Sequence, residues 1–229
     1  MGFETKDCKG GAFVILCLTG DCTPLLDPAR LQQALAALPP WRQNRLVARS
    51  SPEHRAAGAG AWLLVEQGAK KLGIALPSSA PAYTPHGKPY FPDLPRFSFS
   101  LSHSGTRCLC IVSDDGQRLG CDLERLRPLP QWERLARRFF HPQEGEWLSR
   151  QPQPETAFFR LWCEKEAALK ATAAGFSQGM QQFSLRSGTP AGFPQKRDSG
   201  IWEGYAYALC WEAGVEKIPV EPVEILECI

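Results

Sequence analysis

The chain has 229 residues, of which 43% are hydrophobic and 22% are charged, and its formal net charge is +2. Such a composition excludes wholesale disorder, and the small net charge argues against a nucleic-acid-binding protein. The nine cysteines include no CxxC pair, which argues against structural zinc. The sequence shows no secretory leader and no apolar run of membrane length, so we expect free thiols, a cytoplasmic location and no membrane partner.

Hydrophobic periodicity predicts helices and strands along the whole chain. We expect strands at 12–18, 97–102, 108–112, 119–123, 183–185, 204–209 and 220–226. We expect helices at 28–38, 51–72, 131–140 and 154–174, with loops at 77–95 and 187–200. Ser51 before Pro52 is typical of a helix start, and Gly73 and Gly175 are typical of helix ends.

Two features of the predicted strands bear on the fold. The strand at 97–102 alternates large apolar residues with serines, so it should bury one face. The strands at 108–112 and 119–123 should form a hairpin around Asp114-Asp115-Gly116. Because both halves carry helix and strand signals, we predict an α+β fold of two similar-sized lobes, residues 1–116 and 117–229.

Asp122 and Glu124 lie two residues apart on a predicted strand, so both carboxylates should point to the same face. At a separation of about 4 Å and an effective dielectric constant near 20, two such charges repel by roughly 4 kcal/mol. A cation, a proton or exposure to water must offset this repulsion. The alternative to a functional pair is the solvated face of an ordinary antiparallel strand.

Glu166 and Lys170 are four residues apart on a predicted helix, a spacing that also suits a simple surface ion pair. Trp162 lies one turn earlier, so Glu166 should border the buried stripe of this helix and need a partner. Carboxylate ligands without histidine or thiolate favour Mg²⁺ or Mn²⁺ over zinc. Asp122, Glu124 and Glu166 therefore predict a metal site that handles a pyrophosphate.

Several basic residues could contact the same phosphates. His103 follows a predicted strand between two serines, where it suits phosphate contact or proton transfer as well as a structural role. Lys88 lies in a glycine-proline loop and is either a phosphate contact or a solvated surface lysine. A cluster of arginines is either a solvated basic face or a cradle for a ligand with several phosphates. The cluster consists of Arg42, Arg45, Arg49 and Arg55.

Five segments together resemble the signature of the 4′-phosphopantetheinyl transferases. They are Gly87-Lys88-Pro89, Phe99-x-Leu101-Ser102-His103-Ser104, Gly120-x-Asp122-x-Glu124, Phe139-Phe140-His141-Pro142-x-Glu144 and Trp162-x-x-Lys165-Glu166-x-x-x-Lys170. Their order and spacing are similar to the long, single-chain Sfp-type class, over residues 42–183. One departure is Cys121, where relatives usually have isoleucine or valine.

The resemblance implies a fold of two lobes related by a pseudo-twofold axis, each an antiparallel sheet packed with helices, with the active site at their junction. It implies a Mg²⁺-dependent monomer, with Mn²⁺ as a possible substitute, that uses coenzyme A as co-substrate. Such enzymes transfer the phosphopantetheine arm to a serine of an apo acyl, peptidyl or aryl carrier protein and release adenosine 3′,5′-bisphosphate. This is holo-acyl-carrier-protein synthase activity, serving fatty acid, polyketide or nonribosomal peptide synthesis, without a nucleic-acid partner.

The resemblance also assigns roles by position. The metal ligands would be Asp122, Glu124 and Glu166. The coenzyme A contacts would be Arg42, Arg55, Lys88, Ser102, His103, Lys165 and Lys170. The catalytic residues would be Glu166, Lys170, His103 and Glu144. Which acid accepts the serine proton, and which arginines contact the coenzyme A 3′-phosphate, stay open at this point.

Two other readings use the same residues. A metal-dependent hydrolase of a nucleotide diphosphate would need the same carboxylates but would activate a water molecule instead of a serine hydroxyl. A degenerate protein that binds coenzyme A or a carrier without catalysis would not need every acid together with Lys170 and His103, all of which are present here.

Overall fold

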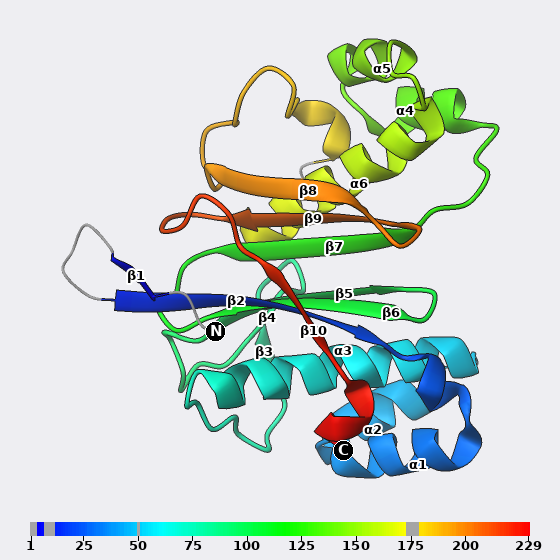
Figure 1. The fold of residues 1–229 in the computed structure, drawn as a ribbon. Helices are drawn as coiled ribbons and strands as arrows, with labels where there is room; N and C mark the ends of the chain where they lie inside the picture. The colour runs from blue at the N-terminus through cyan, green and yellow to red at the C-terminus, as the bar shows by residue number, and fades with distance from the viewer. Residues whose placement is uncertain (1–3, 7–11, 50, 173–178) are drawn as a thin grey trace.

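The computed structural model describes residues 4–6, 12–49, 51–172 and 179–229. Figure 1 shows an α+β protein in which two sheets lie between two groups of helices. No helix in these described ranges combines the length and apolar character needed to cross a membrane.

The first sheet is built mainly from the N-terminal half. Its antiparallel core contains β2 (Ala12–Asp21), β6 (Arg107–Ser113) and β5 (Ser98–Ser104), in that order. Two short strands from opposite ends of the chain, β1 (Glu4–Lys6) and β10 (Val220–Val223), also pair with β2. The long helix α3 (Pro52–Lys71) covers one face, beside α1 (Pro28–Ala37) and α2 (Pro40–Val47).

The second sheet is antiparallel, in the order β7 (Leu119–Arg125), β9 (Tyr205–Trp211) and β8 (Lys196–Trp202). Helix α6 (Pro154–Thr172) packs on one of its faces. Helices α4 (Trp132–Phe139) and α5 (Pro142–Ser149) lie beyond α6 (Figure 1). The sheets share one connectivity, because in each the first strand pairs with the third and the third with the second.

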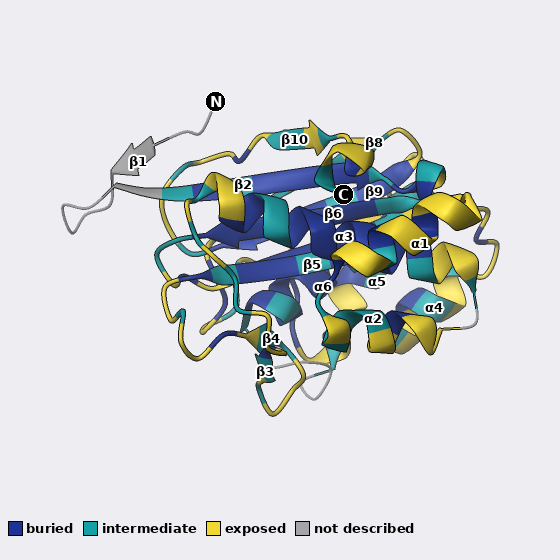
Figure 2. Ribbon diagram, turned by 90° about the horizontal axis from the view of Figure 1, so that it is seen from below, coloured by how far each residue is buried: buried dark blue, intermediate teal, exposed yellow. Residues whose placement is uncertain are grey.

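Three apolar clusters hold the layers together. One fills the space between α3 and the first sheet, and a second lies between α6 and the second sheet. The third joins the two sheets directly, through side chains such as Ile111 and Leu209. Figure 2 shows that buried residues follow the strands, whereas exposed residues lie on the outer faces of the helices.

The C-terminal segment returns to the first sheet. Val220 to Val223 run parallel to Cys17 to Gly20 of β2, and Ile225 belongs to the core beneath α3. The predicted division near residue 116 stays a prediction, but the last residues of the chain pack with the N-terminal half.

Most predicted elements are found, but several differ. The hairpin of 108–112 with 119–123 is wrong, because β6 and β7 belong to different sheets and β6 instead forms a hairpin with β5. No strand forms at 183–185. The predicted loop at 187–200 ends earlier, since β8 begins at Lys196.

The predicted helix ends can be compared in part. Ser51 caps α3, since its side chain accepts a hydrogen bond from the backbone of His54. Gly73 follows α3 with φ +71°, a left-handed conformation that glycine adopts without strain. The helix end predicted at Gly175 lies outside the described residues.

Two short strands, β3 (Ala82–Tyr83) and β4 (Pro89–Tyr90), form a small hairpin in the proline-rich segment. Three short 3₁₀ turns complete the described part of the chain. They are Thr23–Leu26, Met180–Gln182 and Ile225–Cys228. The hairpin matters most for function, because its tip carries Gly87 and Lys88.

Gly120 allows α6 to pack directly on the backbone of β7. A Cβ atom at this position would lie 1.9 Å from the carbonyl oxygen of Ala167 and 2.8 Å from the backbone nitrogen of Ala171. Because these are backbone atoms, no side chain can rotate to relieve the clash. Residue 120 therefore sets the distance between the helix and the strand that carry the candidate site.

We expect Gly120→Ala to destabilise the fold by about 3 kcal/mol or more, because α6 must move away from β7. Urea denaturation followed by circular dichroism measures the effect. The matched control is Gly145→Ala in α5, where an added Cβ meets no atom within 4 Å, so its stability should be unchanged or slightly higher. Equal stability of the two variants would contradict this account.

Candidate active site

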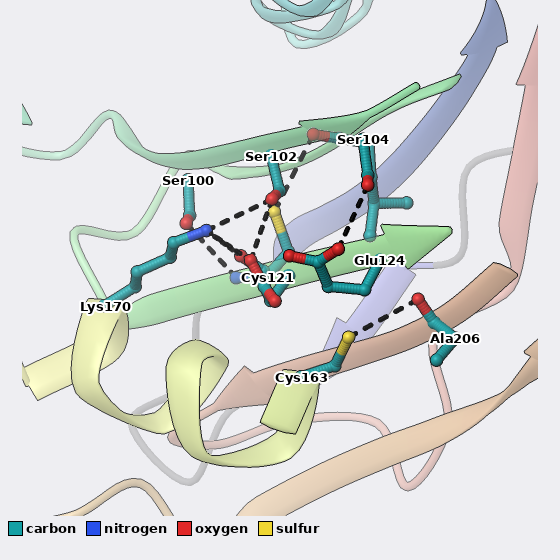
Figure 3. A network of polar contacts seen from close by, with 10 residues as sticks. Ser100, Ser102, Ser104, Cys121, Glu124, Cys163, Lys170 and Ala206 are labelled. Atoms are coloured by element: carbon teal, nitrogen blue, oxygen red, sulfur yellow. Dashed lines mark hydrogen bonds and ion pairs between the residues drawn. The ribbon is translucent and has the colours of Figure 1, made fainter. Parts of the chain in front are cut away.

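The edges of the two sheets meet where β5 lies beside β7, and serine side chains join them (Figure 3). Ser102 donates a hydrogen bond to Asp122 Oδ1 at 2.8 Å, and Ser104 donates to Glu124 Oε2 at 3.1 Å. The prediction that this strand buries one face is incomplete. Ser100 and Ser102 are 7% and 8% exposed, because the serine face is covered by the second sheet.

Lys170 reaches this seam from the last turn of α6. Its ammonium group lies 2.7 Å from Asp122 Oδ1, 3.0 Å from the carbonyl oxygen of Cys121 and 3.2 Å from Ser102 Oγ. Burial acts to lower the pKa of Lys170, but the Asp122 carboxylate beside it raises that pKa above its ordinary value. Lys170 is therefore a permanent cation that bridges α6, β7 and β5.

The second oxygen of Asp122 is left without a partner. Asp122 Oδ1 is bonded to both Lys170 and Ser102, whereas Oδ2 is buried and accepts no hydrogen bond from the described residues. Buried carboxylate oxygens of this kind are rare and often mark the place of an ion or a water molecule.

Two further carboxylates face Asp122. Burial and repulsion by Asp122 raise the pKa of Glu124, whose side chain is also bonded to Ser104 and, at 3.4 Å, to Arg127. Burial, again with repulsion from Asp122, raises the pKa of Glu166 to about 7. Glu166 makes no hydrogen bond or ion pair with the described residues. The surface ion pair of Glu166 with Lys170 is therefore not formed, because Lys170 is bonded to Asp122.

The carboxylates are the type of ligand that a divalent cation binds, but their side chains are not placed around a common point. No three histidine, cysteine or acidic side chains in the described part of the chain are placed to hold a metal ion. The donors are nevertheless all carboxylate oxygens, the type that Mg²⁺ prefers. The unpartnered Asp122 Oδ2 and the mutual repulsion of the three acids show a shortage of positive charge here. These residues fit a magnesium-type ion.

A cavity of about 280 Å³ opens beside the carboxylates. Glu166 and Lys170 of α6 line it, together with Arg42 of α2 and Lys88 of the β3–β4 hairpin. Residues of β5, including Ser100, also line the cavity. The cavity thus places a basic region next to the cluster of acids.

Several nitrogen donors near this cavity lack an acceptor. The guanidinium of Arg42 donates to the carbonyl of Gly58 at 2.8 Å and lies over the Trp62 ring. Burial lowers the pKa of Arg42 to about 10, and repulsion by the nearby Arg45 adds to this effect. Two buried nitrogen atoms of lining residues, Trp41 Nε1 and Arg42 Nε, find no acceptor in the described residues. Arg55 Nε also lacks an acceptor there, but Arg55 does not line the cavity. Donors without acceptors favour an anionic ligand.

Lys88 and His103 complete the basic side of the site. Lys88 donates to the carbonyl of Leu119 at 2.9 Å, and burial lowers its pKa to about 8. His103 lies at the end of β5 and its side chain is exposed. The loss of some surrounding water nevertheless lowers its pKa to about 4, and repulsion by Arg42 and other nearby cations adds to this effect. His103 is therefore neutral at physiological pH in the absence of a bound anion.

Glu144 and Lys165 lie apart from the cavity. They form an ion pair of 2.6 Å, and both side chains are 0% exposed. Lys165 also donates to the carbonyl of Phe183, and Glu144 accepts from the backbone of Leu185 and of His141. This burial does not support the predicted contact of Lys165 with coenzyme A or the predicted catalytic role of Glu144. Their geometry favours a structural role.

Two residues of the site were missed from the sequence. Ser104 bonds Glu124, and Arg127 pairs with the same carboxylate. The signal for Ser104 was present, because the serines of β5 repeat with the same two-residue period as Asp122 and Glu124. Nothing local marks Arg127, whose position follows from the path of the chain after β7.

Comparison with known proteins gives a consistent result. The sequence profile of the 4′-phosphopantetheinyl transferase superfamily matches residues 118–224. The chain is 39% identical over 166 residues to the 4′-phosphopantetheinyl transferase HetI of Nostoc, covering 68% of each chain. It is 33% identical over 129 residues to a 4′-phosphopantetheinyl transferase of Bacillus subtilis, covering 56% of each chain. The match to the 4′-phosphopantetheinyl transferase Sfp of Bacillus subtilis strain 168 has 36% identity over 103 residues and covers 44% of each chain. The chain thus spans about half the length of these last two relatives.

Proposed function

Because the chain belongs to the 4′-phosphopantetheinyl transferase superfamily, we propose that it transfers the phosphopantetheine arm of coenzyme A to a serine of an apo acyl or peptidyl carrier protein. Adenosine 3′,5′-bisphosphate is the other product. The observation that carries the proposal is the meeting of Asp122, Glu166 and Lys170 beside a basic cavity. Such a site suits phosphoryl transfer, in which the protein mainly positions charged reactants.

In this proposal, the cavity binds the anionic groups of coenzyme A. Arg42 and Lys88 line the cavity and supply cations, and the unpartnered Arg42 Nε supports a contact with a phosphate oxygen. Arg55, whose Nε is also unpartnered, does not line the cavity, so its contact with coenzyme A rests on the family resemblance. His103, exposed at the end of β5, offers a neutral imidazole to the same ligand.

The three acids would bind the metal ion at the reaction centre. Asp122, Glu124 and Glu166 would hold Mg²⁺, or Mn²⁺ in its place, and the ion would supply positive charge to the diphosphate. Lys170 provides a second positive charge and is anchored to β5 and β7 by its hydrogen bonds. Ser102 helps to fix both Asp122 and Lys170.

We propose Glu166 as the group that accepts the serine proton. Glu166 lines the cavity and makes no ion pair with Lys170, which is bonded to Asp122, so its carboxylate is available to accept a proton as a general base. As the proton leaves, the serine oxygen bonds to the phosphorus atom of the phosphopantetheine, and the bond from that phosphorus to the bridging oxygen breaks. The bisphosphate departs with the electron pair of that bond.

The test is incubation with coenzyme A, Mg²⁺ and a panel of apo-carriers, followed by mass spectrometry of each carrier. We expect a mass gain of one phosphopantetheine on a serine. Release of free phosphopantetheine without a modified carrier would favour the hydrolase, and binding of coenzyme A without either product would favour a non-catalytic binding protein. Comparison of acyl and peptidyl carriers identifies the pathway.

The cellular setting belongs to the same proposal. All cysteines in the described ranges are free thiols, and all but Cys228 are buried. This favours a reducing compartment such as the cytoplasm. The repeated connectivity of the two sheets supports a monomer in which one chain supplies both sides of the site.

Lys88 makes coenzyme A binding dependent on pH. Its pKa of about 8 means that it is protonated below pH 8 and loses its charge above it. An anionic ligand binds the protonated form, so deprotonation of Lys88 should lower the affinity for coenzyme A by up to about tenfold per pH unit above pH 8. Calorimetric titration from about pH 6.5 to 9.5 measures this. Lys88→Arg keeps its charge and should remove the fall; a wild-type affinity that stays constant to pH 9.5 would contradict the assignment.

Helix α4 offers a docking surface for the carrier. Arg134 and Arg137 are exposed on it, so this surface suits a carrier with an acidic docking face. Charge reversal of both residues should raise the KM for the carrier by roughly tenfold without changing the affinity for coenzyme A. Arg30→Glu on α1, at the other end of the molecule (Figure 1), is the control. An unchanged carrier KM would rule this surface out.

A further inference from the structure

The ammonium group of Lys170 has no free donor. An ammonium has three N–H groups, and those of Lys170 face three acceptors, which are Asp122 Oδ1, the carbonyl of Cys121 and Ser102 Oγ. Figure 3 shows the lysine extended from α6 toward β7 and Ser102. To bind a phosphate oxygen, Lys170 must therefore give up at least one internal bond.

Lys170 also occupies the carboxylate that a divalent cation would use. Asp122 is 8% exposed, and its Oδ1 is taken by Lys170 and Ser102, which leaves only the buried Oδ2. A cation arriving at Asp122 meets a fixed positive charge, and the two repel. This agrees with the finding that the described acidic side chains are not gathered for a metal ion.

The other basic residues near the site are held differently. Arg127 pairs with Glu124 at 3.4 Å, but the arginine side chain is 57% exposed, so solvent and salt weaken that pair. Lys88 lines the same cavity as Lys170 but donates to a backbone carbonyl. Lys170 is therefore the cation, within the described site, that neutralises a buried carboxylate.

We propose that Lys170 is an internal counter-ion that makes the divalent cation and the diphosphate bind cooperatively. The diphosphate draws the ammonium away from Asp122 and exposes that carboxylate to the cation. The cation likewise weakens the hold of Asp122 on Lys170 and frees the ammonium for the diphosphate. Each ligand must strengthen the other by the same factor, because the coupling of two binding equilibria is reciprocal. The inference rests on the proposed function, since it takes coenzyme A as the diphosphate.

Lys170→Met separates this role from simple ligand binding. In the free full-length protein, without coenzyme A, we expect Lys170→Met to bind Mn²⁺ about fivefold or more tightly than wild type, because the competing cation is gone. The same variant should bind coenzyme A more weakly. Lys88→Met is the matched control: it removes an equal charge from the same cavity, and it should weaken coenzyme A binding while changing Mn²⁺ affinity by less than about twofold. Calorimetry measures all three proteins.

A wild-type measurement tests the coupling without any variant, and so decides the question even if Lys170→Met fails to fold. We expect Mg²⁺ to raise the affinity for coenzyme A about fivefold or more, after correction for binding of Mg²⁺ to coenzyme A in solution. Independent binding of the two ligands, or a folded Lys170→Met that binds Mn²⁺ no more tightly than wild type, would overturn the inference while carrier modification continued. Absence of carrier modification would instead overturn the proposed function.

Discussion

Glu166→Gln should lower the rate of carrier modification by about a hundredfold to a thousandfold, the usual contribution of a general base. Glutamine keeps the shape of the side chain but cannot accept a proton. The rate is measured at saturating coenzyme A, carrier and Mg²⁺, so that the change reports on kcat. Glu146→Gln on α5, where the side chain is 69% exposed, is the control and should retain full activity. A Glu166→Gln rate within tenfold of wild type would contradict the assignment.

The same substitution should stabilise the metal-free protein at alkaline pH. The pKa of Glu166 is raised from 4.5 to about 7 in the fold, so the unfolded chain binds fewer protons than the native protein between these pH values. The stability of wild type therefore falls as the pH rises from about 4.5 to 7 and then levels off. Glutamine removes this loss, which corresponds to a few kcal/mol at pH 8 and to none at pH 4. Thermal denaturation in the presence of a chelator measures the difference. Lower activity with higher stability would distinguish a functional acid from a structural one.

Glu144→Gln should destabilise the protein by about 3–5 kcal/mol. It leaves the Lys165 ammonium, which is 0% exposed, without its opposite charge, and a lone buried charge costs far more than the pair contributed. Urea denaturation measures the loss. The exposed pair of Glu133 with Arg137 provides the control, since Glu133→Gln should cost less than about 0.5 kcal/mol.

A double substitution tests whether this cost belongs to the pair. In Glu144→Gln combined with Lys165→Met, the unpaired charge is gone, so the double variant should be more stable than the sum of the single losses predicts. If Glu144 is structural, the Glu144→Gln protein should also modify carriers at nearly the wild-type rate at a temperature where it remains folded. A large loss of kcat in the fully folded variant would restore Glu144 as a catalytic acid.

The sequence was most informative about elements and least informative about their partners. Local periodicity placed most helices and strands, because each depends on which side of its own element is apolar. It failed for the strands at 108–112 and 119–123, since the short turn between them is equally compatible with a hairpin and with a crossing to a second sheet. Only the pairing of β6 with β2 and of β7 with β9 settles this, and these partners are distant in sequence.

For the site as well, the sequence predicted local features but not the contacts between distant residues. The two-residue spacing of Asp122 and Glu124 correctly predicted a shared face, and the helical position of Glu166 correctly predicted burial. The partner of Lys170 could not be predicted, because the four-residue spacing to Glu166 competes with an acid on another element. Lys165 and Glu144 were expected near the ligand because they belong to the motifs, but a motif does not show which of its side chains turn inward.

The pairing of the C-terminal strand β10 with β2 affects how the chain folds during synthesis and whether its first half can fold alone. Cys17 pairs with Val220, and Ile225 fills space above Gly20. During synthesis, the edge of β2 that β10 covers stays open to solvent until the second sheet and its helices have left the ribosome. A fragment of the first 116 residues would keep that edge exposed and lack part of its apolar core, so it should aggregate instead of folding as a separate coenzyme-binding half.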